Sequence, residues 1–418
     1  MKSEKESAFT VIKELQKSGY QAYLVGGCVR DLVLGKTPKD YDVTTDATPD
    51  QVMSLFEKTL TVGASFGVVI VVDEGNQIEV ATFRADGEYG DNRRPNTVTY
   101  SKTAKEDVAR RDFTMNGLVC NFGEFGEVEE EEFCYTVYDG TTLHIKDYVN
   151  GINDIENQVI RCIGDPDTRF HEDALRMLRA VRFAAQLGFE IEYLTELAIT
   201  KNAHLLANVS RERVAAELQK IVSSPFPLKG LVPLFSTNLM EYAIPNYHSS
   251  FNLLRRFGNY PTSDPLMGMS MLFADVSHYR STEMYVRDLK MSNEQCEIIV
   301  NAVENQQLEG NDVEKKKAAR KPGVLDYAVK LAIQNESLFC RDYNYRDRIN
   351  FYTNLSKEDI NPQVFITGKD LIERGLTPGP LFSKIIQAVE DGQLEGIIKT
   401  KEEANVVVAN IVMSAILE

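Results

Sequence analysis

The chain has 418 residues, 43% hydrophobic and 26% charged, a composition typical of a globular protein with more than one domain. No apolar run is long enough to span a bilayer and the N-terminus lacks the apolar core of a signal peptide, so we expect a cytoplasmic protein. The net charge of −16 excludes indiscriminate nucleic-acid binding but allows a basic groove on an acidic body.

The first part of the chain mixes strand and helix patterns, whereas the later part shows helical periodicity only. Residues 1–20 have the spacing of an amphipathic helix. Alternating apolar patterns predict strands at 21–25, 40–45, 66–72, 77–83 and 117–122. Apolar residues recur with helical spacing at 172–189, 210–224, 292–307, 324–339 and 380–394. The sequence therefore predicts an α+β fold, in which a mixed sheet with helices is followed by helices alone.

Two glycines, Gly26 and Gly27, end the first predicted strand and open a helical segment. Glycine lets a backbone approach a ligand closely, and free N–H groups at a helix start favour phosphate. Arg30, in the first turn of that helix, can add a charge-assisted contact to the same anion. The segment therefore predicts a phosphate site.

Two aspartates, Asp40 and Asp42, lie two residues apart in the predicted strand 40–45, so their carboxylates project from one face. Both would not stay ionised if they were buried together without compensation. A divalent cation such as Mg²⁺ compensates them, and two such ions about 3.5–4 Å apart can activate a hydroxyl and stabilise a leaving pyrophosphate. The alternative is a pair of solvent-facing aspartates at a strand end.

Glu79 lies in the predicted strand 77–83 and carries a carboxylate suited to a third metal ligand. The alternative is an exposed strand glutamate. The sequence alone favours neither reading.

Six blocks of sequence resemble, in order, the class II tRNA nucleotidyltransferase / poly(A) polymerase family. They are LVGGCVRDLVLGKTPKDYDVTT (24–45), FRADGEYGDNRRP (83–95), RRDFTMNG (110–117), DYVNGINDIENQVIR (147–161), HEDALRMLRAVRFAAQLGF (171–189) and SRERVAAEL (210–218). The resemblance implies a DNA polymerase β-like nucleotidyltransferase head and all-helical neck, body and tail domains. With breaks near 225–227 and 310–323, we expect the head at 1–150, the neck at 151–224, the body at 225–310 and the tail at 311–418.

The block at 110–117 contains Arg110, Arg111, Asp112 and Asn116. In the resembled family it contacts ribose and phosphates, so Arg111, Asp112 and Asn116 are expected to bind the nucleotide. Salt bridges involving these residues are the structural alternative.

In the block at 171–189, Asp173 and Arg176 are three residues apart, which makes them neighbours on one face of the expected helix. An Asp that accepts from an exocyclic amino group and an Arg that donates to a ring nitrogen suit cytosine and adenine, and clash with uracil and guanine. The resemblance implies this selecting role. Arg179, a candidate triphosphate ligand, and Arg182 continue the row. The alternative is an ordinary surface ion pair between Asp173 and Arg176.

The resemblance implies template-independent addition of CCA to the 3′ end of tRNA from CTP and ATP with Mg²⁺, releasing pyrophosphate. Within the family, a CC-adding enzyme, an A-adding enzyme and a poly(A) polymerase compete with this reading. The loop at 84–107, complete here, and TVGASFGVVIVV (61–72), in place of a basic block, favour CCA addition. A catalytically silent RNA-binding protein is the alternative from another class, and the intact Asp40, Asp42, Asp173 and Arg176 argue against it.

The same resemblance places tRNA binding in the tail, at Gly368, Lys369 and Asp370 of FITGKDLIERGLTPGP. Further basic candidates are 314–323, Arg255–Arg256 and 341–348, each of which could equally be a solvated helix face. None of the histidines, at 144, 171, 204, 248 and 278, is followed by Asp, so no HD-type phosphohydrolase activity is expected. No feature predicts an oligomeric state.

Overall fold

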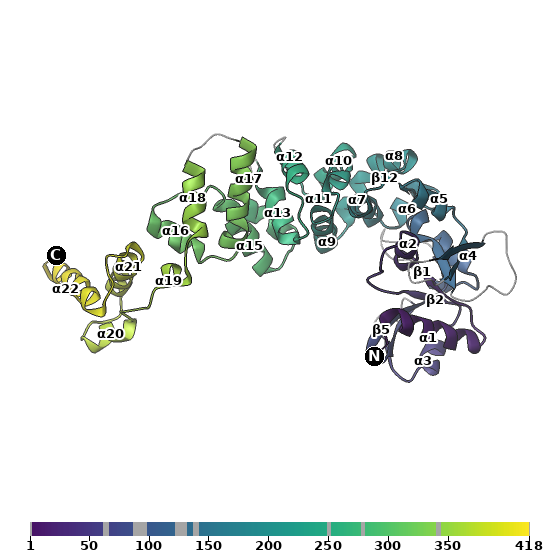
Figure 1. Cartoon of the computed structure of the whole chain (residues 1–418), viewed down its shortest axis with the longest axis horizontal. Helices are drawn as coiled ribbons and strands as arrows, with labels where there is room; N and C mark the ends of the chain where they lie inside the picture. Colours follow the sequence, from purple (N-terminus) through teal and green to yellow (C-terminus); the bar gives the residue numbers. More distant parts are fainter. Residues whose placement is uncertain are drawn as a thin grey trace. The chain divides into compact units, whose positions relative to one another are not determined.

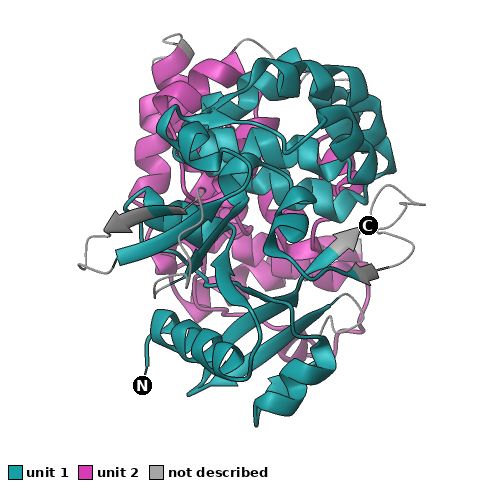
Figure 2. Ribbon diagram, turned by 90° about the vertical axis from the view of Figure 1, so that its right-hand side faces the viewer, with its two compact units in different colours: residues 1–247 teal, residues 248–418 magenta. Residues whose placement is uncertain are grey.

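The structure is a computed structural model that describes residues 2–61, 67–86, 98–121, 132–136, 142–248, 252–276, 281–339 and 344–417. The chain divides into two compact units, Met1–Tyr247 and His248–Glu418 (Figure 2). Among the described helices, none is both long and apolar enough to cross a membrane. The fourfold division into head, neck, body and tail is finer than these two units and stays a prediction.

A mixed sheet of eight strands forms the core of the first unit, in the order β3-β4-β5-β2-β1-β8-β10-β9. The strands are β1 (Ala22–Val25), β2 (Val43–Thr45), β3 (Thr59–Leu60), β4 (Val68–Asp73), β5 (Asn76–Thr82), β8 (Leu118–Asn121), β9 (Glu132–Thr136) and β10 (Thr142–Asp147). The short β2 lies inside the sheet, antiparallel to β1 and parallel to β5, and its three residues are fully buried. All five strands expected from the sequence are present, although β2 begins three residues later than predicted.

The other elements of this part are α1 (Glu4–Lys17), α2 (Gly27–Val33), α3 (Pro49–Leu55), β6 (Arg84–Asp86), β7 (Val98–Tyr100), α4 (Ala104–Ala109), the 3₁₀ turn η2 (Thr114–Asn116) and α5 (Gly151–Glu156). Helix α1 is the predicted amphipathic helix (Figure 1). A capping box of Ser3 and Glu6 starts it, and Val11, Ile12 and Leu15 are buried on the side that faces β1 and β5.

Helices complete the first unit: α6 (Pro166–Glu172), α7 (Leu175–Leu187), α8 (Tyr193–Asn202), the 3₁₀ segment η3 (Ala203–Asn208), α9 (Arg211–Val222), α10 (Pro227–Ser236) and α11 (Leu239–Ala243). A two-stranded parallel sheet, β11 (Val159–Ile160) with β12 (Glu190–Ile191), lies among them. At Gly230 of α10 a Cβ atom would meet the Cβ of Ala185 in α7 at 2.8 Å. Glycine is therefore needed for the close packing of α10 on α7, the helix that follows Asp173 and contains Arg176.

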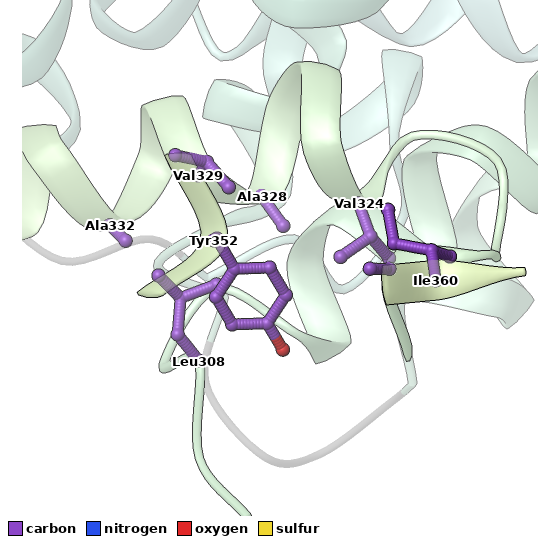
Figure 3. Packing of buried hydrophobic residues seen from close by; sticks show 8 residues of the cluster. Leu308, Val324, Ala328, Val329, Ala332, Tyr352 and Ile360 are labelled. Carbon is purple, nitrogen blue, oxygen red and sulfur yellow. The ribbon is translucent and has the colours of Figure 1, made fainter. Parts of the chain in front are cut away.

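The second unit is all-helical in its described residues. It contains α12 (Asn252–Asn259), α13 (Pro265–Phe273), α14 (Thr282–Asp288), α15 (Asn293–Glu304), α16 (Asp312–Ala319), the π-helical η4 (Val324–Ala328), α17 (Val329–Phe339), α18 (Asn344–Thr353), α19 (Lys357–Ile360), α20 (Gly368–Glu373), α21 (Pro380–Glu395) and α22 (Lys401–Leu417). Figure 3 shows the ring of Tyr352 among the apolar side chains of one core cluster, with Leu308, Ala328 and Ala332. A second cluster joins α20, α21 and α22 through Leu371, Ile385 and Val408.

In two of the basic RNA-binding candidates, cationic side chains are bound to other residues of this unit. Arg256 is fully buried and its guanidinium lies 3.1 Å from Asp275, with further hydrogen bonds to Gln334 and Asn335. A guanidinium with no exposed surface cannot contact a phosphate backbone, so Arg256 stabilises the fold and the expectation of an RNA contact there is wrong.

The basic run 314–323, a candidate RNA contact near an expected domain boundary, belongs to helix α16 and the turn after it. Lys316 donates to the carbonyl of Leu394, and Arg320 lies 2.5 Å from Glu390. Both partners belong to α21, so these cations join two helices of the unit. Of the run 341–348, residues 341–343 lie outside the described residues.

Candidate active site

A cavity of about 470 Å³ lies in the first unit, and nearly every site residue expected there lines it. Seven arginines and four aspartates dominate its wall. The lining residues are Gly26, Gly27, Arg30, Asp40, Asp42, Arg110, Arg111, Asp112, Asn116, Asp173, Leu175, Arg176, Arg179, Arg182, Phe183 and Arg213. Positive charge in a concave site with two glycines suits an anionic ligand such as a triphosphate.

Asp40 and Asp42 reach this cavity from the chain just before β2 rather than from within it. The carbonyl of Asp42 accepts from the N–H of Val25, which ties it to β1, and Tyr41 between the two aspartates is buried. Both carboxylates therefore face the cavity together, as the alternation of an extended chain predicts. Within the described residues, neither carboxylate has a hydrogen-bond or ion-pair partner.

Glu79 lies beside Asp42 but not in the large cavity. Because β2 and β5 run parallel with Val43 opposite Val80, Glu79 is at the level of Asp42. Both line a neighbouring cavity of about 200 Å³. In the part of the chain that the structure describes, no group of three or more His, Cys, Asp or Glu side chains is arranged to hold a metal ion. Asp42 thus shares the large cavity with Asp40 and the smaller cavity with Glu79.

The environment of Asp42 makes the stability of the first unit depend on pH. Burial, and then the carboxylates of Glu79 and Asp40, raise the pKa of Asp42 to about 6. The unfolded value is about 3.9, so between the two the folded protein holds a proton that the unfolded chain lacks. In EDTA, this group should therefore increase the unfolding free energy as the pH falls through about 6.

Asp42→Asn removes this carboxylate and should stabilise the protein by on the order of 1 kcal/mol at about pH 8. The difference from the wild type should shrink as the pH falls through about 6 and disappear only below the unfolded pKa of about 3.9, where Asp42 is protonated in both states. Thermal melts in EDTA across this range measure it. A difference that stayed constant with pH would contradict the raised pKa.

The glycine turn is held against the strands and the 3₁₀ turn η2. Gly26 has a φ of 80°, and a Cβ atom there would lie 3.3 Å from Nη1 of Arg111. Arg30 Nη1 donates to Oδ1 of Asn116 at 2.8 Å, while its Nε and Nη2 contact Asp31. Glycine is therefore required at Gly26 both for the backbone conformation and for the approach of Arg111.

Asp112 joins the head to helix α7. It is buried and accepts from Nε of Arg179 at 2.8 Å and from Nδ2 of Asn116 at 3.2 Å. Burial alone would raise the pKa of Asp112, but Arg179 and Asn116 outweigh it and lower the pKa to about 2. Asp112 is thus an ionised anchor for Arg179 at any physiological pH.

Asp173 and Arg176 both line the cavity, but they do not lie on one helix as expected. Asp173 is the extended residue between α6 and α7, and its Oδ1 accepts from the N–H of Leu175. Its Oδ2 accepts from Arg213 of α9 at 2.9 Å. The chain is extended at Asp173 because its carboxylate accepts from the backbone N–H of Leu175, and a side-chain hydrogen bond of this kind competes with helix formation.

Arg176 is oriented from several sides. It donates to the carboxylate of Glu172 at 2.5 Å and to the carbonyls of Arg169 and Arg110. The carbonyl contact to Arg110 connects α7 to the end of α4. Asp173 and Arg176 are therefore held by different partners, Arg213 and Glu172.

Arg182 lines the cavity from deeper in α7 and pairs with Glu217 of α9 at 3.0 Å. Burial lowers the pKa of Arg182, and among the described residues Nε of Arg182 and Oε2 of Glu217 have no hydrogen-bond partner. The ring of Phe183 lies 4.3 Å from the Arg182 guanidinium carbon and 5.5 Å from that of Arg179. The guanidinium of Arg30 also lies over this ring, so Phe183 makes cation–π contacts with three arginines of the cavity.

The sequence did not single out Arg213, Phe183 or Leu175. Arg213 lies in the block 210–218, which carried the resemblance but no assigned role. The loop at 84–107 is described only at its ends, because 87–97 lie outside the described residues, as do 62–66 of the segment 61–72.

The expected tRNA-binding residues Gly368, Lys369 and Asp370 form the start of α20 in the second unit. Asp370 accepts from the N–H and hydroxyl of Thr367 and pairs with Lys401, so its carboxylate caps the helix. The side chain of Lys369 is 85% exposed, and its ammonium is as far as 4.0 Å from Glu373. The ammonium is therefore accessible.

Two family models match the chain. One, described as the poly A polymerase head domain, covers residues 22–161. The other, described as a probable RNA- and SrmB-binding site of polymerase A, covers residues 188–251. The first contains the expected carboxylates and the glycine turn, and the second begins after α7.

Several curated relatives are CCA-adding enzymes. The chain is 33% identical to that of Lacticaseibacillus paracasei over 395 residues, which cover 94% of this chain and 93% of the relative. It is 44% identical to that of Geobacillus thermodenitrificans over 260 residues, which cover 62% of this chain and 59% of that relative.

The fold is similar to solved structures of CCA-adding enzymes. One, from Bacillus stearothermophilus in complex with CTP, has a TM-score of 0.76 and 28% identity, and the match covers 99% of both chains. Another, from Thermotoga maritima in complex with tRNA, has a TM-score of 0.58 at 18% identity and supports the fold only.

Proposed function

The chain belongs to the CCA-adding enzymes, whose head domain is that of poly(A) polymerases, and from this we propose that it adds CCA to the 3′ end of tRNA from CTP and ATP. It is a nucleotidyltransferase, and its reaction releases pyrophosphate. The observation that carries the proposal is the joint lining of one cavity by Asp40 and Asp42 and by Asp173 and Arg176. Such an enzyme acts on tRNA in the cytoplasm.

Asp40 and Asp42 are the residues that would hold the divalent cation, which we take to be Mg²⁺. Their carboxylates are unpaired among the described residues, whereas Asp112 and Asp173 in the same cavity are each paired with an arginine. Two unpaired carboxylates at the edge of an arginine-rich cavity fit a hard cation that also meets phosphate oxygens. The cation supplies a lowered hydroxyl pKa and charge neutralisation at the leaving pyrophosphate.

The arginines of the cavity bind and orient the triphosphate. Arg30, Arg111 and Arg179 each keep one face towards the cavity while a carboxylate or amide of the protein fixes the other. A fixed guanidinium loses little conformational entropy when phosphate binds. Glu79 lies outside this cavity, and we assign it no ligand role.

Asp173 and Arg176 read the base. Asp173 accepts from the exocyclic amino group of cytosine or adenine, and Arg176 donates to the neighbouring ring nitrogen. Uracil and guanine present a carbonyl to the carboxylate and an N–H to the guanidinium, so their buried polar groups stay unpaired. Selection for C and A then needs no nucleic-acid template.

In the second unit, the accessible Lys369 binds a phosphate of the tRNA, with the backbone of Gly368 beside it. Lys369→Gln should weaken tRNA binding and reduce the slope of log K against log[salt] by about one, since one phosphate contact is lost. Filter binding without nucleotide, over a salt series, measures both. Lys13→Gln on α1 is the matched control, and an unchanged slope in Lys369→Gln would remove this residue from the interface.

Three tRNA transcripts that lack CCA, CA or A, each incubated with single nucleotides, test the proposed function. A CCA-adding enzyme extends the first two with CTP and only the third with ATP. Extension of the first two transcripts with CTP but none of the third with ATP would identify a CC-adding enzyme instead. Extension of the third transcript alone would identify an A-adding enzyme, and a run of A a poly(A) polymerase.

A further inference from the structure

A buried carboxylate that no motif reading singled out lies directly behind two arginines of the cavity. Asp107, in the first turn of α4, is 1% exposed. Its Oδ1 accepts from Nε and Nη2 of Arg110 at 3.0 and 2.5 Å. Its Oδ2 accepts from Nε and Nη2 of Arg111 at 3.3 and 3.0 Å. One carboxylate therefore holds both guanidinium groups by their inner edges.

The same carboxylate is fixed to two strands of the head. Oδ1 accepts from the backbone N–H of Arg84 in β6 at 3.3 Å, and Oδ2 lies 3.5 Å from the hydroxyl of Thr44. Thr44 follows Asp42 by two residues on β2. Asp107 is therefore connected both to β6 and to β2, the strand that directly follows Asp40 and Asp42.

The arginines that Asp107 holds lie where two cavities meet. Arg110 and Arg111 line both the large cavity and its smaller neighbour, and Asp42 is the carboxylate that the two cavities share. Since Arg111 uses Nε and Nη2 for Asp107, Nη1 is the atom turned to the glycine turn, 3.3 Å from where a Cβ of Gly26 would be. A phosphate that enters over Gly26 meets this edge of the guanidinium.

We propose that Asp107 is the positioning residue of the triphosphate site, which sets the guanidinium groups of Arg110 and Arg111 for the phosphates beside the metal-binding aspartates. It contacts no substrate itself. The inference rests on the proposed function, because it assumes that the large cavity takes a nucleoside triphosphate.

The role predicts an effect that depends on the number of phosphates. Asp107→Asn keeps the size of the side chain but turns an amide N–H₂ towards one of the two arginines, which must then rotate away. The affinity for CTP should fall about tenfold, the loss expected for one misplaced charged hydrogen bond, whereas the affinity for CMP should change less than about twofold. A residue that merely held the fold would weaken both ligands equally.

Calorimetric titration of the full chain with CTP, CDP and CMP in Mg²⁺ measures the ratio of the dissociation constants. Glu106→Gln is the matched control, since Glu106 precedes Asp107 on α4, is exposed and loses the same charge. Where Asp107→Asn does not fold, Asp107→Glu, which keeps the charge on a longer side chain, should reduce the CTP-to-CMP discrimination in the same sense.

The ratio separates this inference from its premise. A wild type that bound CMP as tightly as CTP would overturn the triphosphate site, and with it the role of Asp107. A wild type that discriminates, together with an Asp107 variant that keeps the same ratio, would overturn the positioning role alone. An additive loss in the double variant Asp107→Asn/Arg111→Lys would do so too, because residues that act through one another are not additive.

Discussion

Asp42→Asn is expected to reduce the incorporation of both CTP and ATP by roughly a thousandfold or more, with tRNA affinity unchanged. The amide cannot replace the carboxylate as an anionic ligand, and the remaining Asp40 holds a divalent cation alone. Asp40→Asn should have an effect of the same order. Both nucleotides depend on the same pair because one cavity contains these aspartates together with the base-reading residues.

Single-turnover extension of tRNA transcripts by CTP and by ATP measures this loss, and filter binding measures the tRNA affinity. Asp50→Asn is the matched control, because Asp50 is exposed in the first turn of α3 and lines neither of the two cavities described. Near-normal turnover of Asp42→Asn in Mg²⁺ would show that these carboxylates do not hold the metal. Equal loss in the control would point to general destabilisation of the head.

Asp173→Ala should change which base is accepted rather than only slow the enzyme. Without the carboxylate, the carbonyl of uracil or guanine loses its main clash, and the amino group of cytosine or adenine loses its acceptor. The ratio of kcat/KM for CTP over UTP should fall about tenfold or more, since one charged hydrogen bond is worth roughly 1.5–3 kcal/mol. The ratio for ATP over GTP should fall in parallel.

The structure adds a control to this experiment, because Asp173 also pairs with Arg213 at 2.9 Å. Arg213→Lys loosens that pair but keeps the carboxylate, so it should lower activity with every nucleotide and leave the ratios nearly unchanged. Steady-state kinetics with the four nucleotides measure both variants. If Asp173→Ala lost CTP and UTP activity in equal proportion, Asp173 would be a structural residue that fixes α7 against α9.

The sequence predicted the parts of the site that lie close together along the chain. The two glycines at the start of α2, the two aspartates before β2, and Asp173 and Arg176 around the start of α7 were all expected at one site, and all line the cavity. Their residue types and spacings are what the chemistry requires, so local patterns were enough to find them. The same holds for the long amphipathic helices, whose apolar period is a property of single segments.

Contacts between distant segments could not be predicted in this way. Asp173 reaches Arg213 across 40 residues, and Arg30 reaches Asn116 across 86. Contacts of this kind depend on how whole segments pack and on local backbone changes such as the extended residue Asp173 between α6 and α7. For the same reason the basic residues Arg256 and Arg320 were expected on the surface, although each is paired with a carboxylate distant along the chain, Asp275 and Glu390.

The position of β2 inside the sheet has a consequence for hydrogen exchange. Strands β1 and β5 flank it on both sides, and Val43, Thr44 and Thr45 have no exposed surface. Amides of such a strand exchange only when a large part of the unit opens, whereas the edge strands β3 and β9 can fray alone. The aspartates that precede β2 are thus anchored to the slowest-exchanging part of the head, and partial opening at the sheet edges leaves them in place.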